Sequence, residues 1–233
     1  MLKVLFITVV TSGIWLLLIR SFTKKPSMPL GYYFAVGLMG GAFAVQLVDV
    51  FNITFFSITG IKTCQINFRN PVNAYIVAIL VGFNEEAWKL IATLIILDWH
   101  SRQSKQPLNL LVFGIVISLG FDFWENIQYG DIFGWQIVLW RSIIPGHQVY
   151  GAIWSYGLSE GYSQTKYRTD VQLIIACYIL AAVYHSTYNF LIFLKEDWGF
   201  FMAIVISWLP MIFFYKHLKR LYRTEKQVRS GVP

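Results

Sequence analysis

Ionisable and amide side chains recur at helical spacing inside the most apolar stretches of this sequence. The segment "VGFNEEAWKLIATLIIL" carries Glu85, Glu86 and Lys89 within an otherwise apolar run. Positions i, i+3 and i+4 share one face of a helix, so Lys89 can pair with Glu85 and can also reach Glu86. Adjacent residues point about 100° apart on a helix. One glutamate could therefore do chemistry while the other is an anchor.

Three later apolar stretches each carry a polar cluster of their own. The clusters are Asp122, Glu125 and Asn126 in "FDFWENIQYG", Arg141, His147 and Glu160 in "WRSIIPGHQVYGAIWSYGLSEG", and His185 and Asn189 in "YHSTYNF". Counted at 1.5 Å per residue, the histidines and the glutamate pair fall at similar depths in a membrane. We therefore expect one shared site. Asp122, Arg141 and Glu160 lie nearer the ends of their stretches, where snorkelling or an interfacial salt bridge is the expected role.

These side chains support more than one kind of chemistry. A carboxylate beside an imidazole can position and deprotonate a water molecule, which is the general-base step of hydrolysis, and Asn126 or Asn189 could stabilise the oxyanion that forms. A divalent metal such as Zn²⁺ could instead be held by these carboxylates and imidazoles, in the set Glu86, Glu125, His147 and His185. No H-E-x-x-H motif is present, and the spacing does not decide between the two modes. A buried ion pair that only fixes helix register is the structural alternative.

The elements that must position these groups are membrane helices. Of the 233 residues, 56% are hydrophobic and only 13% are charged, about half the charge of a soluble domain. Lipid offers no partner for free backbone groups, and nothing alternates like a barrel strand, so we expect an all-α polytopic transmembrane bundle. It would form a single domain over residues 1–233, with a catalytic core at about 72–194 and a basic tail at about 216–233. A span needs about 20 apolar residues, and seven candidates occur, at 2–19, 31–56, 72–97, 109–129, 135–158, 171–194 and 198–215.

The distribution of Lys and Arg predicts the orientation of the chain. With the N-terminus outside, most of these residues fall in cytoplasmic flanks, including Arg20, Lys24, Lys25, Arg102, Lys105 and the basic tail. The positive-inside rule therefore favours an outside N-terminus and a cytoplasmic C-terminus in the cell membrane. The formal net charge of +7 is placed to meet anionic lipid of the bilayer, and no nucleic-acid partner is expected.

The four polar clusters, in their order along the chain, resemble the motifs of the PrsW intramembrane proteases. "EEAWK" fits E-E-x-x-K, "FDFWEN" fits F-x-x-x-E-N, "RSIIPGHQVYGAIWSYGLSEG" fits a helix with one histidine followed by spaced glycines, and "HSTYN" fits H-x-x-x-D/N. That family is distantly related to the type II CAAX prenyl proteases within the Abi-type superfamily. The likeness covers roughly residues 72–194.

The resemblance implies an activity and a set of residues. The family's essential pair falls on Glu85 and Glu86, and its other motif residues fall on Lys89, Glu125, Asn126, His147 and His185. It implies cleavage of a membrane-anchored protein, with anti-sigma factors the known bacterial type, by either a metal-dependent or a glutamic mechanism. Asn189 stands where Asp is common in the family.

The leading hypothesis is an intramembrane endopeptidase. Glu85 or Glu86 would be the base, His147 or His185 would assist it, and Asn126 would aid the oxyanion. The supporting residues would be Lys89, Asn189 and Arg141. A proton-coupled transporter or channel that uses the same groups as a relay is the alternative, but transporters usually show internal repeats and none is found here. A non-catalytic scaffold descended from such a protease is the third reading.

Overall fold

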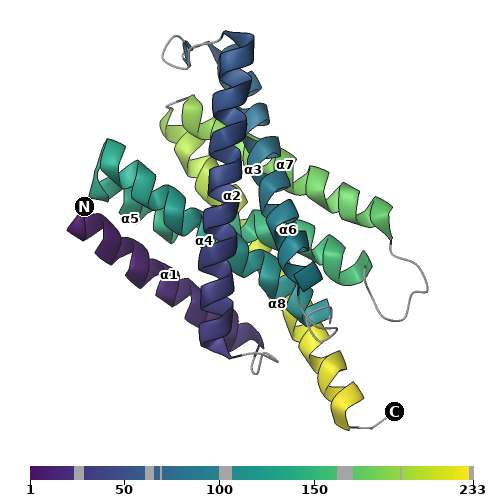
Figure 1. Cartoon of the computed structure of the whole chain (residues 1–233). Helices are drawn as coiled ribbons and strands as arrows, with labels where there is room; N and C mark the ends of the chain where they lie inside the picture. Colours follow the sequence, from purple (N-terminus) through teal and green to yellow (C-terminus); the bar gives the residue numbers. More distant parts are fainter. Residues whose placement is uncertain are drawn as a thin grey trace.

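Helices are the only regular secondary structure among the residues that the structure describes. This computed structural model describes residues 1–23, 29–60, 66–68, 70–99, 107–161, 170–194 and 196–230. The helices in these ranges are α1 (Leu2–Thr23), α2 (Leu30–Thr59), α3 (Pro71–Trp99), α4 (Pro107–Phe133), α5 (Trp135–Ile143), α6 (Gly146–Gly161), α7 (Val171–Phe193) and α8 (Asp197–Ser230). The predicted all-α helical bundle is confirmed (Figure 1).

Five of these helices are long and apolar enough to cross a membrane. They are α1, α2, α4, α7 and α8, judged by length and composition over the described residues. α3 is 29 residues long, but it carries the Glu85, Glu86 and Lys89 charges in its middle. The predicted total of seven spans and the predicted orientation of the termini remain predictions.

The predicted span at 135–158 is wrong as a single helix. The chain instead forms α5, leaves the helical conformation at Ile144, and starts α6 at Gly146. Proline has no N–H and disfavours the helical conformation of the residue before it. Pro145 accordingly follows Ile144 at φ −83° and ψ 120°, an extended conformation. This elbow, residues 142–145, places His147 in the first turn of α6.

The centre of the bundle is α4. In its most apolar stretch, 89% of the residues are buried inside the molecule. α2 crosses α4 so closely that no side chain would fit between the two helices at the crossing. A Cβ built on Gly41 would overlap the backbone of Gly120, and one built on Gly120 would overlap the backbone of Gly37. Small residues of this kind let membrane helices approach closely.

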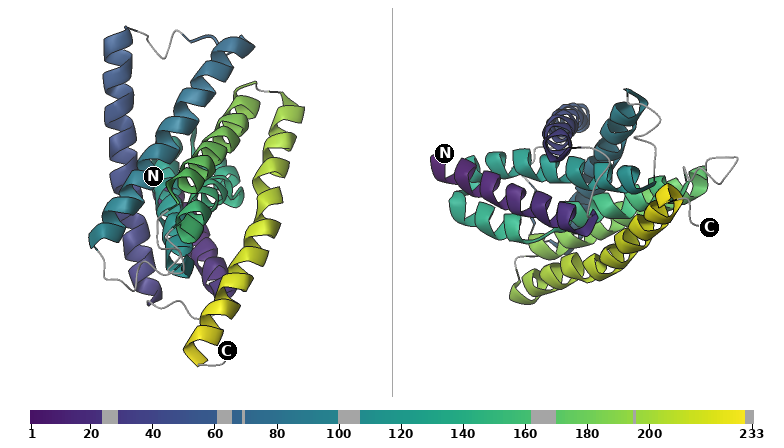
Figure 2. Two further views of the ribbon diagram at one scale, coloured as in Figure 1. Left: turned by 90° about the vertical axis from the view of Figure 1, so that its right-hand side faces the viewer. Right: turned by 90° about the horizontal axis from the view of Figure 1, so that it is seen from below.

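The remaining helices surround this centre and bring the polar clusters inward. α6 packs on α4 through Gly114 and Gly151, and α3 packs on α7 through Gly82. Figure 2 shows α2 and α8 on opposite sides of the bundle, with α3, α4, α6 and α7 between them. The polar faces of these inner helices therefore meet one another rather than lipid.

Candidate active site

The glutamate pair and the lysine of α3 form a buried ion cluster. Lys89 Nζ lies 2.7 Å from Glu86 Oε1 and 3.5 Å from Glu85 Oε2. Lys89 and Glu86 are fully buried, and Glu85 is 5% exposed. The pairing predicted from the i+3 and i+4 spacing is therefore confirmed.

The two glutamates have different surroundings. Both carboxylate oxygens of Glu86 are engaged, because Oε1 pairs with Lys89 Nζ and with His185 Nδ1 at 2.8 Å, and Oε2 accepts a hydrogen bond from Trp154 Nε1 at 3.0 Å. Oε2 of Glu85 is buried and has no hydrogen-bond partner among the described residues. Glu86 is therefore the anchored residue of the pair, whereas Glu85 Oε2 has only the longer ion pair with Lys89 and no hydrogen bond.

The hydrogen bonds assign the tautomers of the two histidines. Lys89 Nζ lies 2.8 Å from His147 Nδ1, and an ammonium group only donates, so Nδ1 accepts. The proton of His147 is then on Nε2, which lies 2.8 Å from Glu125 Oε2. His185 Nδ1 donates to Glu86, which leaves its Nε2 as an acceptor 3.8 Å from Glu85 Oε2. The rings of His147 and His185 meet edge to face, with centroids 5.2 Å apart.

Glu125 is held by a second cation, Arg141, which comes from the short helix α5. Arg141 pairs with Glu125, and its Nε donates to Asn126 Oδ1 at 3.0 Å. Its guanidinium also stacks 3.9 Å above the ring of Tyr129. The amide nitrogen of Asn126 donates to Ser142 Oγ at 3.2 Å. Asn126 is thus engaged at both ends in holding α4 to α5.

Asp122 lies inside the site, contrary to its predicted place near a membrane surface. It is 4% exposed, it accepts from Gln148 Nε2 at 3.4 Å, and its Oδ1 is 4.0 Å from His147 Nε2. The prediction was wrong because α4 continues to Phe133, beyond the predicted end at 129. Glu160 does lie away from the site, in an ion pair with Arg220 of α8 at 2.8 Å.

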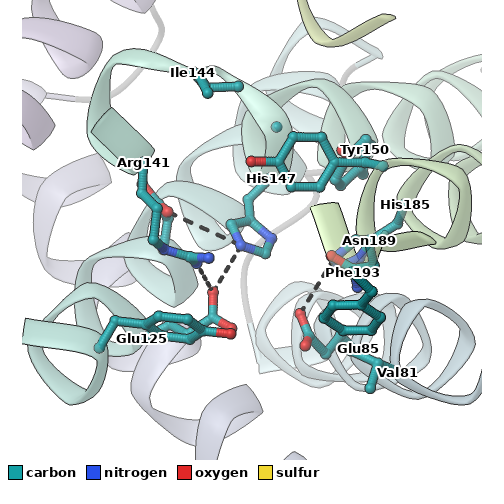
Figure 3. A pocket seen from close by; sticks show the side chains of 14 residues that line it. Val81, Glu85, Glu125, Arg141, Ile144, His147, Tyr150, His185, Asn189 and Phe193 are labelled. Atoms are coloured by element: carbon teal, nitrogen blue, oxygen red, sulfur yellow. Dashed lines mark hydrogen bonds and ion pairs between the residues drawn. The ribbon is translucent and has the colours of Figure 1, made fainter. Parts of the chain in front are cut away.

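A cavity of about 100 Å³ opens between these groups (Figure 3). Figure 3 shows Glu125 joined to both Arg141 and His147 on one side and Glu85 joined to His185 on the other. Its lining comes from α3, α4, α5, the elbow, α6 and α7, and it comprises Val81, Glu85, Asp122, Glu125, Tyr129, Arg141, Ile144, Gly146, His147, Tyr150, His185, Tyr188, Asn189 and Phe193. Apart from Glu160, the four polar clusters of the sequence are thus brought to one place, and Asn189 lines the cavity with them.

Two aromatic residues of the site, Tyr150 and Trp154, are not among the residues predicted from the sequence. Trp154 holds Glu86, and the ring of Tyr150 stacks on His185 with centroids 4.6 Å apart. The spacing of His147, Tyr150 and Trp154, at i, i+3 and i+7, was the available signal, because it puts all three on one face of α6. Because 18% of the residues in this chain are aromatic, aromatic residues at helical spacing do not by themselves indicate a site.

The side chains that could hold a metal ion differ from the predicted set. Among the described residues, two groups have ligand atoms within 4.8 Å of one another, Glu85 with His147 and His185, and Asp122 with Glu125 and His147. Glu86, a predicted ligand, belongs to neither group, since Lys89, Trp154 and His185 occupy its oxygens. Glu85 Oε2, which accepts no hydrogen bond, and the unprotonated Nε2 of His185 fit a metal such as Zn²⁺, whose usual ligands include both residue types.

A helical membrane bundle with a buried Glu–Lys–His cluster beside a small polar cavity has the features of an intramembrane hydrolase. Residues 28–215 match the family described as PrsW family intramembrane metalloprotease, and the chain belongs to this family. The resemblance noted in the sequence is confirmed. The chain is accordingly a multi-pass membrane protein and a protease.

Curated relatives agree with this assignment. The chain is similar to Protease PrsW of Shouchella clausii, with 29% identity over 149 residues, 61% of this chain and 67% of the relative. It is also similar to Protease PrsW of Halalkalibacterium halodurans, with 27% identity over 151 residues, 62% of this chain and 67% of the relative. No solved structure matches the chain.

Proposed function

We propose that the chain is an endopeptidase that cleaves membrane-anchored, single-span proteins at this cavity, with Glu85 as the group that activates water. The observation that carries the proposal is the contrast between the two glutamates. Glu86 has both oxygens hydrogen-bonded, whereas Glu85, which lines the cavity, has a buried Oε2 without a hydrogen bond, 3.5 Å from Lys89 Nζ and 3.8 Å from His185 Nε2. A general base must lie within reach of the water that it deprotonates.

In the proposed reaction, side chains of the cavity transfer one proton and stabilise the oxyanion. Glu85 takes a proton from water as the water oxygen bonds to the scissile carbonyl carbon. When the C–N bond breaks, the same proton passes to the leaving amine nitrogen. Arg141 and Asn189 line the cavity and offer N–H donors to the oxyanion. Asn126, the donor predicted from the sequence, instead holds Arg141 in place.

The family description includes a metal, and the side chains present fit one. Glu85 and His185 would hold it, together with His147 if that ring exchanged its contact with Lys89 or Glu125 for the metal. The metal would supply Lewis-acid polarisation of the carbonyl or a more acidic water. Glu85 is required in both modes, as a base without the metal and as a ligand with it. His185 is required in both modes as well, through its free Nε2.

The membrane-anchored substrate class rests on the family and on the depth of the site. Two of the helices that line the cavity, α4 and α7, are long and apolar enough to cross a membrane. Anti-sigma-factor-like proteins with a single span are the substrates that the resemblance implies. A proton-coupled transporter using the same groups remains the alternative, and it predicts proton flux without peptide cleavage.

The test is cleavage of a library of single-span peptides by the purified protein in detergent, read by mass spectrometry. The wild type would be measured with and without a chelator, beside Glu85→Gln, His185→Ala and the control Glu196→Gln, which alters an exposed glutamate at the start of α8. We expect cleavage by the wild type and the control, and none by the two site variants. Cleavage that survives both site substitutions would refute the proposed site. Loss of cleavage with chelator would assign the metal mode.

A further inference from the structure

A second and larger hollow lies on the other face of α6. It has a volume of about 330 Å³, and α1, α4, α6 and α8 line it with almost entirely apolar groups. Trp15 and Ile19 come from α1, and Met211 and Phe214 come from α8. We call this hollow the α1–α8 groove.

The groove and the catalytic cavity share the wall formed by the first turns of α6. Gln148 lines the groove, and its neighbour His147 lines the cavity. The side-chain nitrogen of Gln148 donates to Asp122 of the cavity at 3.4 Å. Its oxygen is buried and has no hydrogen-bond partner among the described residues. One side chain thus links the groove to the catalytic cluster.

A second link runs through the elbow between α5 and α6. Trp15, in the groove, donates from Nε1 to the backbone oxygen of Ser142 at 2.8 Å. The hydroxyl of the same serine accepts from Asn126, which holds Arg141. A group bound in the groove would therefore contact two residues that are each hydrogen-bonded to the framework of the site.

The shape and polarity of the two hollows suit different parts of a membrane-anchored substrate. The cavity is small and lined by charged side chains, so it can take a short extended backbone but not an apolar span. The groove is apolar, and its α8 rim is open to the lipid side, because Ile212 is 61% exposed and Trp208 is 43% exposed. Aromatic anchors such as Trp15 and Trp208 are typical of the centres of binding surfaces.

We propose that the α1–α8 groove is the docking site for the apolar transmembrane segment of the substrate. The span lies against α1 and α8, and its end reaches the elbow beside the catalytic cavity. At this end of the groove lies Gln148, whose amide nitrogen is hydrogen-bonded to Asp122 of the cavity. This inference rests on the proposed endopeptidase function for the identity of the occupant.

Photo-crosslinking tests the docking without relying on cleavage. The full chain carrying Glu85→Gln would be placed in liposomes with a photoreactive amino acid at Ile212, or at Ile179 of α7 as a control, which is 45% exposed outside the groove. The probe is a biotinylated single-span peptide of about 20 leucine and alanine residues. We expect a crosslink from position 212 that excess unlabelled peptide removes, and none from position 179. Crosslinks only to phospholipid, or equal crosslinks at both positions, would overturn the proposal.

Kinetics in the wild-type background give the second readout. Ile212→Trp fills the groove, whereas Leu209→Trp makes the same change at an equally exposed α8 position, 61% in both cases, outside the groove lining. For a single-span substrate we expect Ile212→Trp to raise KM about tenfold with a smaller effect on kcat. Leu209→Trp should leave both constants unchanged. Equal KM values for the two variants would overturn the docking site.

The two tests separate this inference from the proposed function. Specific crosslinking at position 212 with no cleavage by the wild type would keep the groove and reject the endopeptidase. Cleavage by the wild type without specific crosslinking would keep the endopeptidase and reject the groove.

Discussion

Glu85 and Glu86 are neighbours in the chain, but the helix turns them toward different surroundings. The angle of about 100° between adjacent residues sends Glu86 toward Trp154 of α6 and His185 of α7. It sends Glu85 toward the cavity. A buried carboxylate needs an opposite charge and hydrogen-bond donors to stay ionised, and Glu86 has both. Glu85 is less fully compensated, which is the condition expected of a reactive group.

The indole of Trp154 should matter to stability and to activity through a single hydrogen bond. Trp154→Phe keeps an aromatic ring but removes the N–H that Glu86 Oε2 accepts. Leaving a buried acceptor unpaired costs about 1–3 kcal/mol. We expect a lower melting temperature in detergent and slower cleavage.

The matched control for this change is Trp99→Phe. Trp99 is 91% exposed, so its loss of an N–H should have no effect on melting or cleavage. The interpretation of Trp154 would be wrong if both variants behaved like the wild type.

Part of this site could be predicted from the sequence alone. Spacing alone paired Lys89 with both glutamates, because helix geometry is local and regular. It did not reveal that Asp122 is buried with His147, since that depends on where α4 ends and on which helix packs beside it. Contacts such as that of Trp154 with Glu86 join residues 68 positions apart, and helical spacing carries no information at that range.

At the scale of elements, the close crossing of α2 over α4 positions the helix that carries Asp122 and Glu125. Gly41→Ala would drive a Cβ into the backbone of Gly120. Overpacking of this kind costs about 1–3 kcal/mol. We expect the variant to melt at a lower temperature than the wild type and to cleave its substrate more slowly.

The control for the crossing is Gly13→Ala in α1. A Cβ at Gly13 meets nothing within 4 Å, and alanine favours a helix over glycine by about 0.5–1 kcal/mol. Its melting temperature should stay the same or rise. Similar losses in the two alanine variants would show that the α2–α4 crossing is not specially tight.

The helix boundaries show which local signals can be trusted. Six predicted spans correspond to single helices, because long apolar runs bounded by polar residues and Pro or Gly are strong signals. The seventh, at 135–158, overlooked Pro145 within "RSIIPGH". Proline often marks a helix boundary. Here it produces the elbow, whose Ile144 lines the cavity beside Gly146 of α6.

For the whole molecule, the break between α5 and α6 bears on how the chain crosses the bilayer. α5 has nine residues and at 1.5 Å per residue it is too short to span. α5 and α6 together would make one crossing, in keeping with the seven spans and opposite-sided termini that the charge distribution predicts.

Cysteine labelling tests this orientation. In a Cys177→Ser background, we expect an impermeant maleimide to label the native Cys64, between α2 and α3, on intact cells. A cysteine introduced by Ser230→Cys, at the end of α8, should react only after permeabilisation, because the tail is expected in the cytoplasm. Labelling of position 230 on intact cells would reverse the topology.

The most direct test of the division of labour between the two glutamates is a paired measurement of cleavage rate and melting temperature for Glu85→Gln and Glu86→Gln. Loss of a general base costs about 10²–10⁴-fold in rate, and loss of one partner of a buried ion pair costs about 3–5 kcal/mol of stability. We predict that Glu86→Gln lowers both the cleavage rate and the melting temperature. Glu85→Gln should abolish cleavage but lower the melting temperature less, because Lys89 Nζ lies 3.5 Å from Glu85 Oε2 and 2.7 Å from Glu86 Oε1. The reverse pattern, an inactive but stable Glu86→Gln beside an active Glu85→Gln, would contradict the account.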